Sequence, residues 1–458
     1  MMMEAAIVPD DDGKRKWLYP ALRKGKLYKW RSAISYVYLV FFFAGPFLRI
    51  GGQPFLLLNA IERKFVILGQ VFWPEDIFLF VIATLVFVVF VILFTIAFGR
   101  VFCGWICPQT IFMEMVFRKV EIWIEGDANK RRKLDASEWT REKVLKKVLK
   151  HVIFILLSFL IANTFLAYVT GSENLLKIVT EPVSAHVIGF VSICIFTVAF
   201  YLVYSQVREL VCTVICPYGR LQGVLIDKDT VVVAYNDVRG EPRGKLKRDT
   251  EQSQKGDCVD CDLCVAVCPT GIDIRNGTQL ECINCTACID ACNHVMEKIK
   301  KPLNLIGYYS ENMIVNNQKP SFTWKMGGYS VIMVLLIGIL SYFIFSRSDI
   351  DMTVMRSGGM LYQEQPGNYV SNIYNAEIIN KSNEKRVIII KATDPAVKIK
   401  YIQAPGAIEK GTSVKVVFFV MLPANAIHSP KTTIKLQLTS AGKVLETENT
   451  SFIGPINN

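Results

Sequence analysis

Five long apolar stretches limit the possible folds of this chain more than any other feature of its sequence. A helix that crosses the hydrocarbon core of a bilayer needs about 17–25 mostly apolar residues. The stretches run over roughly 33–50, 77–99, 152–170, 187–207 and 328–346. We therefore expect a polytopic α-helical membrane protein with about five spans, and the mean hydropathy of +0.32 agrees with that class.

Basic residues alternate strongly between the segments that flank these stretches. Lysine and arginine together number 8 in 1–32, 2 in 51–76, 12 in 100–151, 1 in 171–186 and 15 in 208–327. Positive charge collects on the cytoplasmic side of membrane proteins. The counts predict a cytoplasmic N-terminus and, after an odd number of spans, a periplasmic C-terminus. The long basic N-terminal flank lacks a small-residue cleavage site, which favours an uncleaved anchor over a signal peptide.

The formal net charge of +12 does not indicate a protein that binds nucleic acid. No aromatic–basic binding module accompanies the charge. Basic residues that line the cytoplasmic ends of membrane helices account for it instead. The basic groups at 130–133 and 143–150 are expected to face solvent or lipid headgroups. The charge therefore predicts the lipid bilayer as a partner, and no nucleic acid.

Two runs of four cysteines share one spacing. The first reads C-x2-C-x2-C-x3-C-P from Cys258 to Pro269, and the second repeats it from Cys282 to Cys292 with Asn293 in place of the proline. In two-cluster bacterial ferredoxins the fourth cysteine of each run ligates the other cluster. We therefore expect two [4Fe–4S] clusters. Their predicted ligand sets are Cys258, Cys261, Cys264 and Cys292 for the first cluster, and Cys282, Cys285, Cys288 and Cys268 for the second.

Structural zinc is the alternative explanation of these cysteines, because tight cysteine groups in a reducing compartment are typical of metal sites. Zinc knuckles need paired C-x2-C arrangements, which the two runs fit poorly. The proline after the last cysteine shapes a turn and does not ligate. Its replacement by Asn293 is therefore expected to change the exposure or tuning of the second cluster but not its formation. All-cysteine ligation predicts low-potential, one-electron carriers.

A second cysteine motif follows two of the predicted spans. The segment FCGWICPQT contains Cys103 and Cys107, and VCTVICPYG contains Cys212 and Cys216. The i, i+4 spacing places both sulfurs of a pair on one helical face, and the proline tends to end that helix or begin the next. Ordinary packing is the alternative for one such pair, but two identical pairs favour one four-thiolate site.

These four cysteines are the candidate catalytic residues. Soft-metal binding such as Cu(I), thiol–disulfide electron transfer and a further metal centre are all open as their role. Met113 and Met115 follow the first pair and could add thioether ligands, although filling of packing gaps is the simpler explanation.

Beyond about residue 360 the pattern changes to short alternating runs punctuated by turn residues. The runs cover 372–379, 387–391, 397–402, 414–422, 432–438 and 446–452. Six or seven strands in about 100 residues are typical of an immunoglobulin-like sandwich. No catalytic constellation lies in this region, so we expect a docking module.

The features together predict five parts. They are a cytoplasmic basic N-terminus (1–32), a four-span membrane region with both C-x3-C-P motifs (33–250), a cytoplasmic two-cluster ferredoxin domain (251–327), a fifth span (328–346) and a periplasmic all-β immunoglobulin-like domain (347–458).

The C-x3-C-P motifs after membrane spans, the double ferredoxin run, the further span and the C-terminal sandwich together resemble the CcoG/FixG/RdxA family. The similarity extends from about residue 30 to 455, and the segment from Ile373 to Lys381 also resembles that family's C-terminal domain. The C-x3-C-P and ferredoxin elements alone are shared with NapH/NosR-type membrane ferredoxins. The added sandwich favours the first family.

The resemblance implies an accessory protein of the bacterial inner membrane that acts in assembly of a cbb-type cytochrome oxidase. Its implied partners are a cytoplasmic electron donor and either oxidase subunits or copper chaperones. The family's proposed activity is reduction of Cu(II) to Cu(I), which would take place near Cys103, Cys107, Cys212 and Cys216 and would make the chain a cupric reductase.

Two alternatives stand beside this expectation. One is an electron-transfer subunit of a quinol-linked respiratory pathway of the NapH/NosR kind, and the other is a non-redox assembly scaffold. The quinol-linked alternative predicts electron partners such as membrane-anchored cytochromes, and no C-x2-C-H haem-attachment motif occurs in this sequence.

Overall fold

The computed structural model describes residues 17–22, 24–59, 64–73, 76–245, 255–320, 322–359, 361–382, 384–402, 404–427, 429–440 and 442–455. These residues form two compact units. The first draws on Met1–Leu48, Leu57–Asn59 and Phe80–Ile339, and the second on Arg49–Leu56, Ala60–Leu79 and Leu340–Asn458. The units divide the chain differently from the five parts expected from the sequence, because residues between the first two apolar stretches group with the C-terminal strands.

Four helices of the described chain are long and apolar enough to cross a membrane. They are α2 (Ile77–Phe98), α7 (Arg141–Thr170), α9 (Val187–Leu202) continued by the π-helical η5 (Val203–Val207), and α15 (Trp324–Phe345). They overlap four of the five predicted spans, although α7 begins eleven residues before the predicted 152–170. In α15 no residue is buried, and α2 contains no charged residue. Apolar side chains that face outward along a helix are those a lipid environment accepts.

The first predicted span differs from the expectation of 33–50. Helix α1 (Lys26–Ala44) begins seven residues earlier and ends where Gly45 and Pro46 start a 3₁₀ turn. Its first two turns carry Lys26, Lys29 and Arg31, and it is not among the four helices that meet the length and hydropathy of a span.

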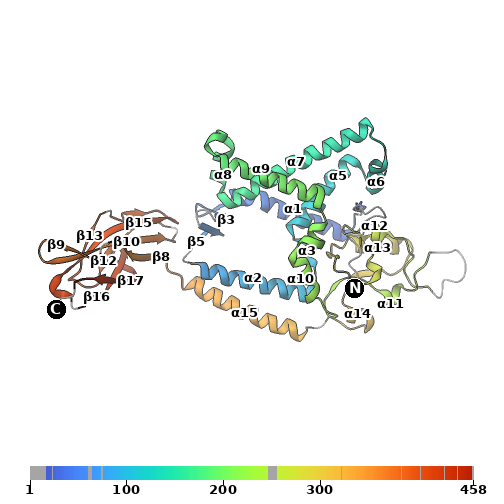
Figure 1. Cartoon of the computed structure of the whole chain (residues 1–458). Helices are drawn as coiled ribbons and strands as arrows, with labels where there is room; N and C mark the ends of the chain where they lie inside the picture. Colours follow the sequence, from blue (N-terminus) through green and yellow to red (C-terminus); the bar gives the residue numbers. More distant parts are fainter. Residues whose placement is uncertain are drawn as a thin grey trace. The chain divides into compact units, whose positions relative to one another are not determined.

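Aromatic side chains form the core between the membrane helices of the first unit. Phe117 stacks on Tyr204 with ring centroids 4.4 Å apart and meets Phe154 edge-on at 4.8 Å. These rings come from three segments, so their contacts hold α7 and the end of α9 against the helix that follows the first C-x3-C-P motif (Figure 1). Offset and edge-on aromatic pairs add about 0.5–1.5 kcal/mol each to ordinary burial.

Two strands that flank the cysteine-rich segment, one on each side, pair with each other. Strand β6 (Val232–Tyr235) precedes the first cysteine run and pairs antiparallel with β7 (Ile306–Tyr309), which follows the second. Between them lie the short helix α12 (Leu263–Ala266) and the longer α13 (Ala287–Lys298). The pairing brings both runs into one ferredoxin-like body.

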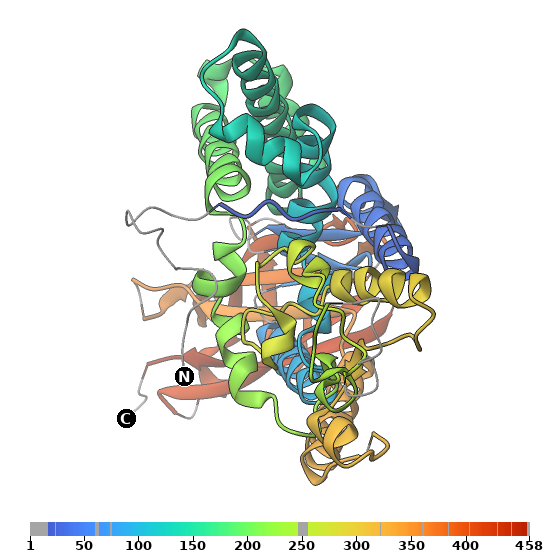
Figure 2. The same cartoon turned by 90° about the vertical axis from the view of Figure 1, so that its right-hand side faces the viewer.

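Helix α13 fastens this body to α1. The carboxylate of Asp290 on α13 accepts hydrogen bonds from the backbone N–H groups of Leu27 and Tyr28, at 3.2 and 2.8 Å. These N–H groups lie in the first turn of α1, which has no partners for them within the helix. The two helices lie side by side in Figure 2.

The second unit contains the predicted immunoglobulin-like sandwich. One sheet has the order β13 (Lys398–Tyr401), β15 (Ser413–Pro423), β10 (Tyr369–Asn380) and β8 (Ile350–Arg356), with β9 (Gln363–Gln365) also on β10. The other has the order β12 (Ile389–Ala392), β16 (Lys431–Ser440) and β17 (Lys443–Ile453). All six predicted strands are present, whereas β8 and β9 were not predicted. Alternate residues such as Val416, Phe418 and Val420 point into the core and are fully buried, as one buried face requires.

A small ionic network lies within this second unit, which includes the residues just before α2. Asp76 accepts from Lys381 and from Arg347, each at 2.6 Å, and Lys381 also pairs with Asp351. Asp76 and Lys381 are almost fully buried. The described residues before α2 include short strands, and the backbone of Gly51 accepts a hydrogen bond from Lys410 of the sandwich.

Candidate metal centres

The first predicted ligand set surrounds one cavity. Cys258, Cys261, Cys264 and Cys292 line an empty volume of about 370 Å³, together with Arg275 and apolar residues of β6, β7 and α13. Three cysteines come from the first run and the fourth from the second. The structure thus brings together the four residues that the sequence groups, and their role as ligands stays a prediction.

The second predicted set surrounds a separate cavity of about 350 Å³. Cys268, Cys282, Cys285 and Cys288 line it, with Ile272, Ile274 and Val233 closing its apolar wall. Again one cysteine is exchanged between the runs. Cys264 of the first set also lines the second cavity, so the two cavities are neighbours. Each contains the four thiols that a [4Fe–4S] cluster takes as ligands.

Both cysteine loops have the same unusual backbone. The residues on either side of the second cysteine are left-handed in each run: Asp260 and Asp262 have φ of 52° and 56°, and Asn284 and Thr286 have φ of 52° and 65°. L-residues seldom adopt this conformation. Alternation of left- and right-handed residues points successive N–H groups into a concavity that favours an anionic group. The backbone therefore fits an anionic thiolate cluster as well as the side chains do.

Burial makes these thiols poor acids unless a cation binds them. Burial raises the pKa of Cys285 and Cys264 to about 11 and that of Cys282 and Cys292 to about 12. A coordinating metal removes the proton from a thiol outright. At neutral pH these four residues would thus become thiolates through metal binding rather than through their surroundings.

The two membrane-edge turns are structural repeats of each other. Cys107 precedes α4 (Pro108–Ile111), and Cys216 precedes α10 (Pro217–Leu225), with the proline in the first turn of each helix. The N–H of Cys107 bonds to Phe102 O at 3.0 Å, and that of Cys216 bonds to Val211 O at 2.8 Å. Both bonds reach back five residues. This wide turn leaves the second cysteine outside regular α-helix, so the predicted single helical face through each pair is wrong.

The four membrane-edge thiols interact across the two repeats. Cys103 donates to Oε1 of Gln222 at 3.3 Å, and Thr110 Oγ1 lies 4.0 Å from Cys212 Sγ. Burial raises the pKa of Cys212 to about 12, with further raising by Cys107 and Cys103, and burial together with Cys216 raises that of Cys107. The pairs therefore converge, although among the described residues no three His, Cys, Asp or Glu side chains are close enough to hold one metal ion.

A buried arginine lies beside the same thiols. Arg100 donates from Nε to Gln222 Oε1 at 2.8 Å and from Nη2 to the carbonyl of Cys212 at 3.5 Å. It also donates to the carbonyl of Leu280, just before the second cysteine run. A single buried cation thus contacts both membrane-edge repeats and the ferredoxin body, a role that its position in the sequence did not reveal.

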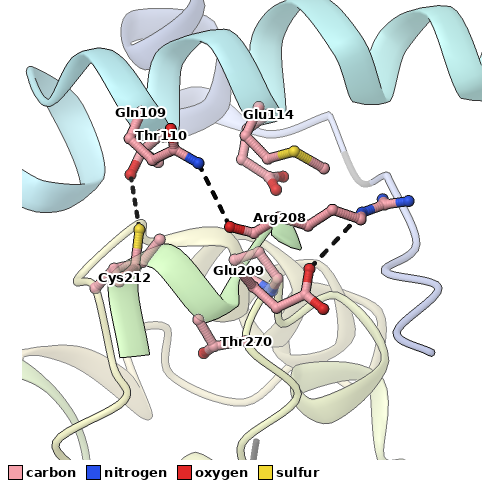
Figure 3. A pocket seen from close by; sticks show the side chains of 10 residues that line it. Gln109, Thr110, Glu114, Arg208, Glu209, Cys212 and Thr270 are labelled. Carbon is pink, nitrogen blue, oxygen red and sulfur yellow. Dashed lines mark hydrogen bonds and ion pairs between the residues drawn. The ribbon is translucent and has the colours of Figure 1, made fainter. Parts of the chain in front are cut away.

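A cavity of about 290 Å³ opens beside Cys212 (Figure 3). Gln109, Thr110 and Glu114 line it from the helix after the first turn, and Arg208 and Glu209 line it from the second repeat. Met113 also lines it, whereas Met115 is on another side, where its sulfur accepts the Ser32 hydroxyl at 3.8 Å. Cys212 is the one cysteine among the described residues that line this cavity.

The basic segments expected to face solvent or lipid are partly buried. Glu121 on α5 (Arg118–Glu125) pairs with Arg208 at 2.8 Å and with Arg131 at 3.3 Å, and Lys150 pairs with Glu125 at 2.9 Å. Burial alone would raise the pKa of Glu121, but Arg208 and its neighbours lower it to about 2. The expectation was wrong for Arg131 and Lys150 because acidic partners on α5 compensate their charge.

Comparisons with known proteins agree with this arrangement. A 4Fe-4S dicluster domain matches residues 207–311, a 4Fe-4S binding domain matches 80–131, and the immunoglobulin-like fold at the C-terminus of FixG matches 340–455. The chain therefore contains iron–sulfur binding domains, and both membrane-edge cysteine pairs fall inside the matched ranges.

Three curated relatives match most of the chain. Protein RdxB of Cereibacter sphaeroides is 35% identical over 399 residues, which are 84% of this chain and 83% of that protein. Nitrogen fixation protein FixG of Rhizobium meliloti is 32% identical over 82% of this chain and 79% of that protein. Protein RdxA of Cereibacter sphaeroides is 35% identical over 78% of this chain and 77% of that protein. With two cysteine-lined cavities, apolar helices and the C-terminal sandwich, the chain is a member of the FixG/RdxA family of membrane-associated iron–sulfur electron-transfer proteins.

Proposed function

We propose that this protein reduces Cu(II) to Cu(I), one electron at a time, with electrons from a cytoplasmic donor. The Cu(I) is then available for delivery to a cbb-type cytochrome oxidase during its assembly. The observation that carries the proposal is the position of Cys103 and Cys212, one thiol from each membrane-edge pair, which pack together with Cys285 of the second cysteine set.

The chemistry of the residues suits this reaction. When bound, [4Fe–4S] clusters supply single electrons at low potential, and Cu(II) takes up one electron to become Cu(I). Thiolate and thioether ligands favour Cu(I) over Cu(II). Cys103, Cys107, Cys212 and Cys216 would hold the product, and the cavity beside Cys212 would admit the ion.

The proposal includes an orientation and a set of partners. The N-terminus, the segment 100–151 and the ferredoxin body would lie in the cytoplasm, and the sandwich would lie in the periplasm. This orientation requires α1 to cross the membrane as a fifth span. The sandwich would then dock oxidase subunits or a periplasmic copper chaperone.

A double substitution tests the function. The protein is purified without oxygen, its iron and sulfide are measured, and its oxidation by Cu(II) is followed by stopped-flow absorbance. We expect about eight iron atoms for two clusters. The Cys103→Ala/Cys107→Ala variant should keep both iron–sulfur signals and lose Cu(II) reduction.

Cys194 provides the matched control, because it is an exposed cysteine on α9 away from both motifs. Cys194→Ala should reduce Cu(II) at the wild-type rate. A wild-type copper rate in the double variant would rule out the membrane-edge site, and stoichiometric zinc without a reducible signal would rule out the clusters.

A further inference from the structure

The first membrane-edge turn packs directly on the loop that carries the second cysteine set. Cys103, Ile283 and Cys285 form one buried group, and Cys212 packs against it. Cys285 also lines the second cavity. A candidate copper thiol and a candidate cluster thiol therefore share the same small patch of core.

Gly104 makes this close approach possible. A Cβ on Gly104 would lie 3.0 Å from the carbonyl carbon and oxygen of Asn284, and closer still to the carbonyl oxygen of Ile283. These obstacles are backbone atoms, so no flexible side chain can move aside. Gly104 lies in helix α3 (Val101–Trp105) and has no positive φ. The glycine is thus required for proximity rather than for backbone conformation.

Arg31 fastens the same contact from the other side. Its Nε donates to the carbonyl of Gly104 at 2.7 Å, and the side chain is 5% exposed. Its charge also acts on the Cys285 thiol, whose pKa burial raises to about 11 and Arg31 lowers in part. One arginine on α1 thus holds the turn in place and adds positive charge to the second set.

The two cavities differ in their relation to the membrane edge. The second cavity and the cavity beside Cys212 share Pro269, Thr270 and Ile283 in their walls. The described residues that line the first cavity all belong to the ferredoxin body, from Tyr235 to Ile306. Its Cys261 is exposed instead.

We infer that Gly104 is a positioning residue that couples the second cysteine set to the membrane-edge thiols, so that this set and not the first exchanges electrons with them. The first set, at exposed Cys261, is left to face the cytoplasmic donor. The inference rests on the proposed function for the identity of the acceptor, Cu(II), but not for the contact itself.

Gly104→Ala tests the coupling, with Gly328→Ala as the matched control. Gly328 lies in helix α15, and a Cβ there would meet nothing within 4 Å. In Gly104→Ala the two backbones must move apart, and a displacement of about 1 Å at a reacting pair costs up to about 100-fold in rate. We expect oxidation of the reduced protein by Cu(II) to slow at least about tenfold, and Gly328→Ala to match wild type.

A spectroscopic readout identifies the set involved without relying on copper. Cys258→Ser and Cys282→Ser assign the two EPR signals of the reduced protein. Gly104→Ala should change the line shape or potential of the signal lost in Cys282→Ser and leave the other unchanged. A change confined to the signal lost in Cys258→Ser, or no change in either, would overturn the inference.

A second variant guards against misfolding of the alanine substitution. Arg31→Gln removes positive charge beside Cys285 and should lower the potential of that same signal only, and an unchanged potential would count against the coupling. If both variants shift this signal while wild-type protein leaves Cu(II) unreduced, the coupling stands and the proposed function fails.

Discussion

The two cysteine sets have the same backbone but opposite surroundings. In the first loop the left-handed positions are Asp260 and Asp262, and Arg275 pairs with both at 2.7 Å. In the second loop they are Asn284 and Thr286, which are 2% and 1% exposed. The cysteine spacing determines the loop conformation, whereas the residues between the cysteines determine whether the loop faces water or packs into the protein.

On the electron path proposed above, this difference would give different roles to two sites that their ligands alone would make equivalent. The charged residues Asp260 and Asp262 lie on either side of exposed Cys261, where the proposed donor would approach. Neutral residues allow the second loop to be buried against the membrane-edge turn without leaving a charge unpaired. Ordered electron transfer can thus arise from four residues that ligate nothing.

Loss of Arg275 should give the largest effect, because it should remove the cluster of the first set and leave that of the second. Its side chain is 7% exposed and also pairs with Asp273, so Arg275→Ala leaves three carboxylates beside an anionic site. We expect iron to fall from about eight to about four atoms, with the signal of the first set lost and that of the second kept. Iron analysis and EPR measure this outcome.

Two controls define the role of Arg275. Arg275→Lys keeps the charge but not the forked geometry, and should fall between wild type and alanine. Arg243→Ala removes an arginine whose ion pair with Glu241 is long, at 4.0 Å. This variant should keep all the iron. If Arg275→Ala lost both signals equally, the first loop would not depend on it separately.

Asn293→Pro sharpens the comparison at the ends of the two runs. The first run ends at Cys268 and Pro269, just after helix α12 has ended. Asn293, by contrast, lies inside helix α13, and it forms hydrogen bonds with Asn304 at 2.7 and 3.1 Å. Where the motif's proline would shape a turn, Asn293 thus continues a helix. Proline within a helix costs about 3 kcal/mol or more.

We expect the ferredoxin-like second proline to destabilise this protein rather than improve it. Thermal unfolding followed by visible absorbance should shift downward for Asn293→Pro. Asn293→Ala removes the same side-chain bonds but keeps the helix, and should be much milder. Equal loss in the two variants would locate the effect in the contacts with Asn304 instead.

Glycine and alanine substitutions should give the smallest effect. A left-handed L-residue costs about 1–2 kcal/mol relative to its right-handed form, and glycine escapes that cost. Asn284→Gly should therefore be more stable than Asn284→Ala by about 1 kcal/mol, and the pair Asp260→Gly and Asp260→Ala should show the same gap. Because Asn284 is buried, its substitutions should lower the free energy of unfolding more, relative to wild type, than the substitutions of Asp260 do. The reverse order would contradict the comparison between the two loops.

Local sequence patterns predicted much of this molecule. Features that depend on pairing between distant segments were predicted poorly. Cysteine spacing grouped the residues of both cavities, because the ferredoxin exchange of the fourth cysteine is a regular property of the motif. Alternation predicted the long strands β10, β15 and β16. The short β9 and the strands before α2 lack enough residues to show a period.

The missed features of the site depend on partners far along the chain. Arg131 was expected to face solvent or lipid because nothing in its own basic segment reveals its partner Glu121. The same carboxylate also pairs with Arg208, which lies 87 residues from it along the chain. Gly104 looked like an ordinary small residue, since the backbone that excludes a side chain there is at Ile283 and Asn284. Such requirements become visible only when the segments are placed together.

The twin turns at Cys107 and Cys216 have an evolutionary consequence. Each repeat would supply two thiols of the proposed four-thiol site, so the site would be built like the interface of a two-fold dimer whose halves lie in one polypeptide. An ancestral chain with a single turn could have built the same site by pairing with a second copy of itself. The two turns now differ, because Gly104, which meets the ferredoxin body, follows Cys103 in the first turn and Thr213 follows Cys212 in the second.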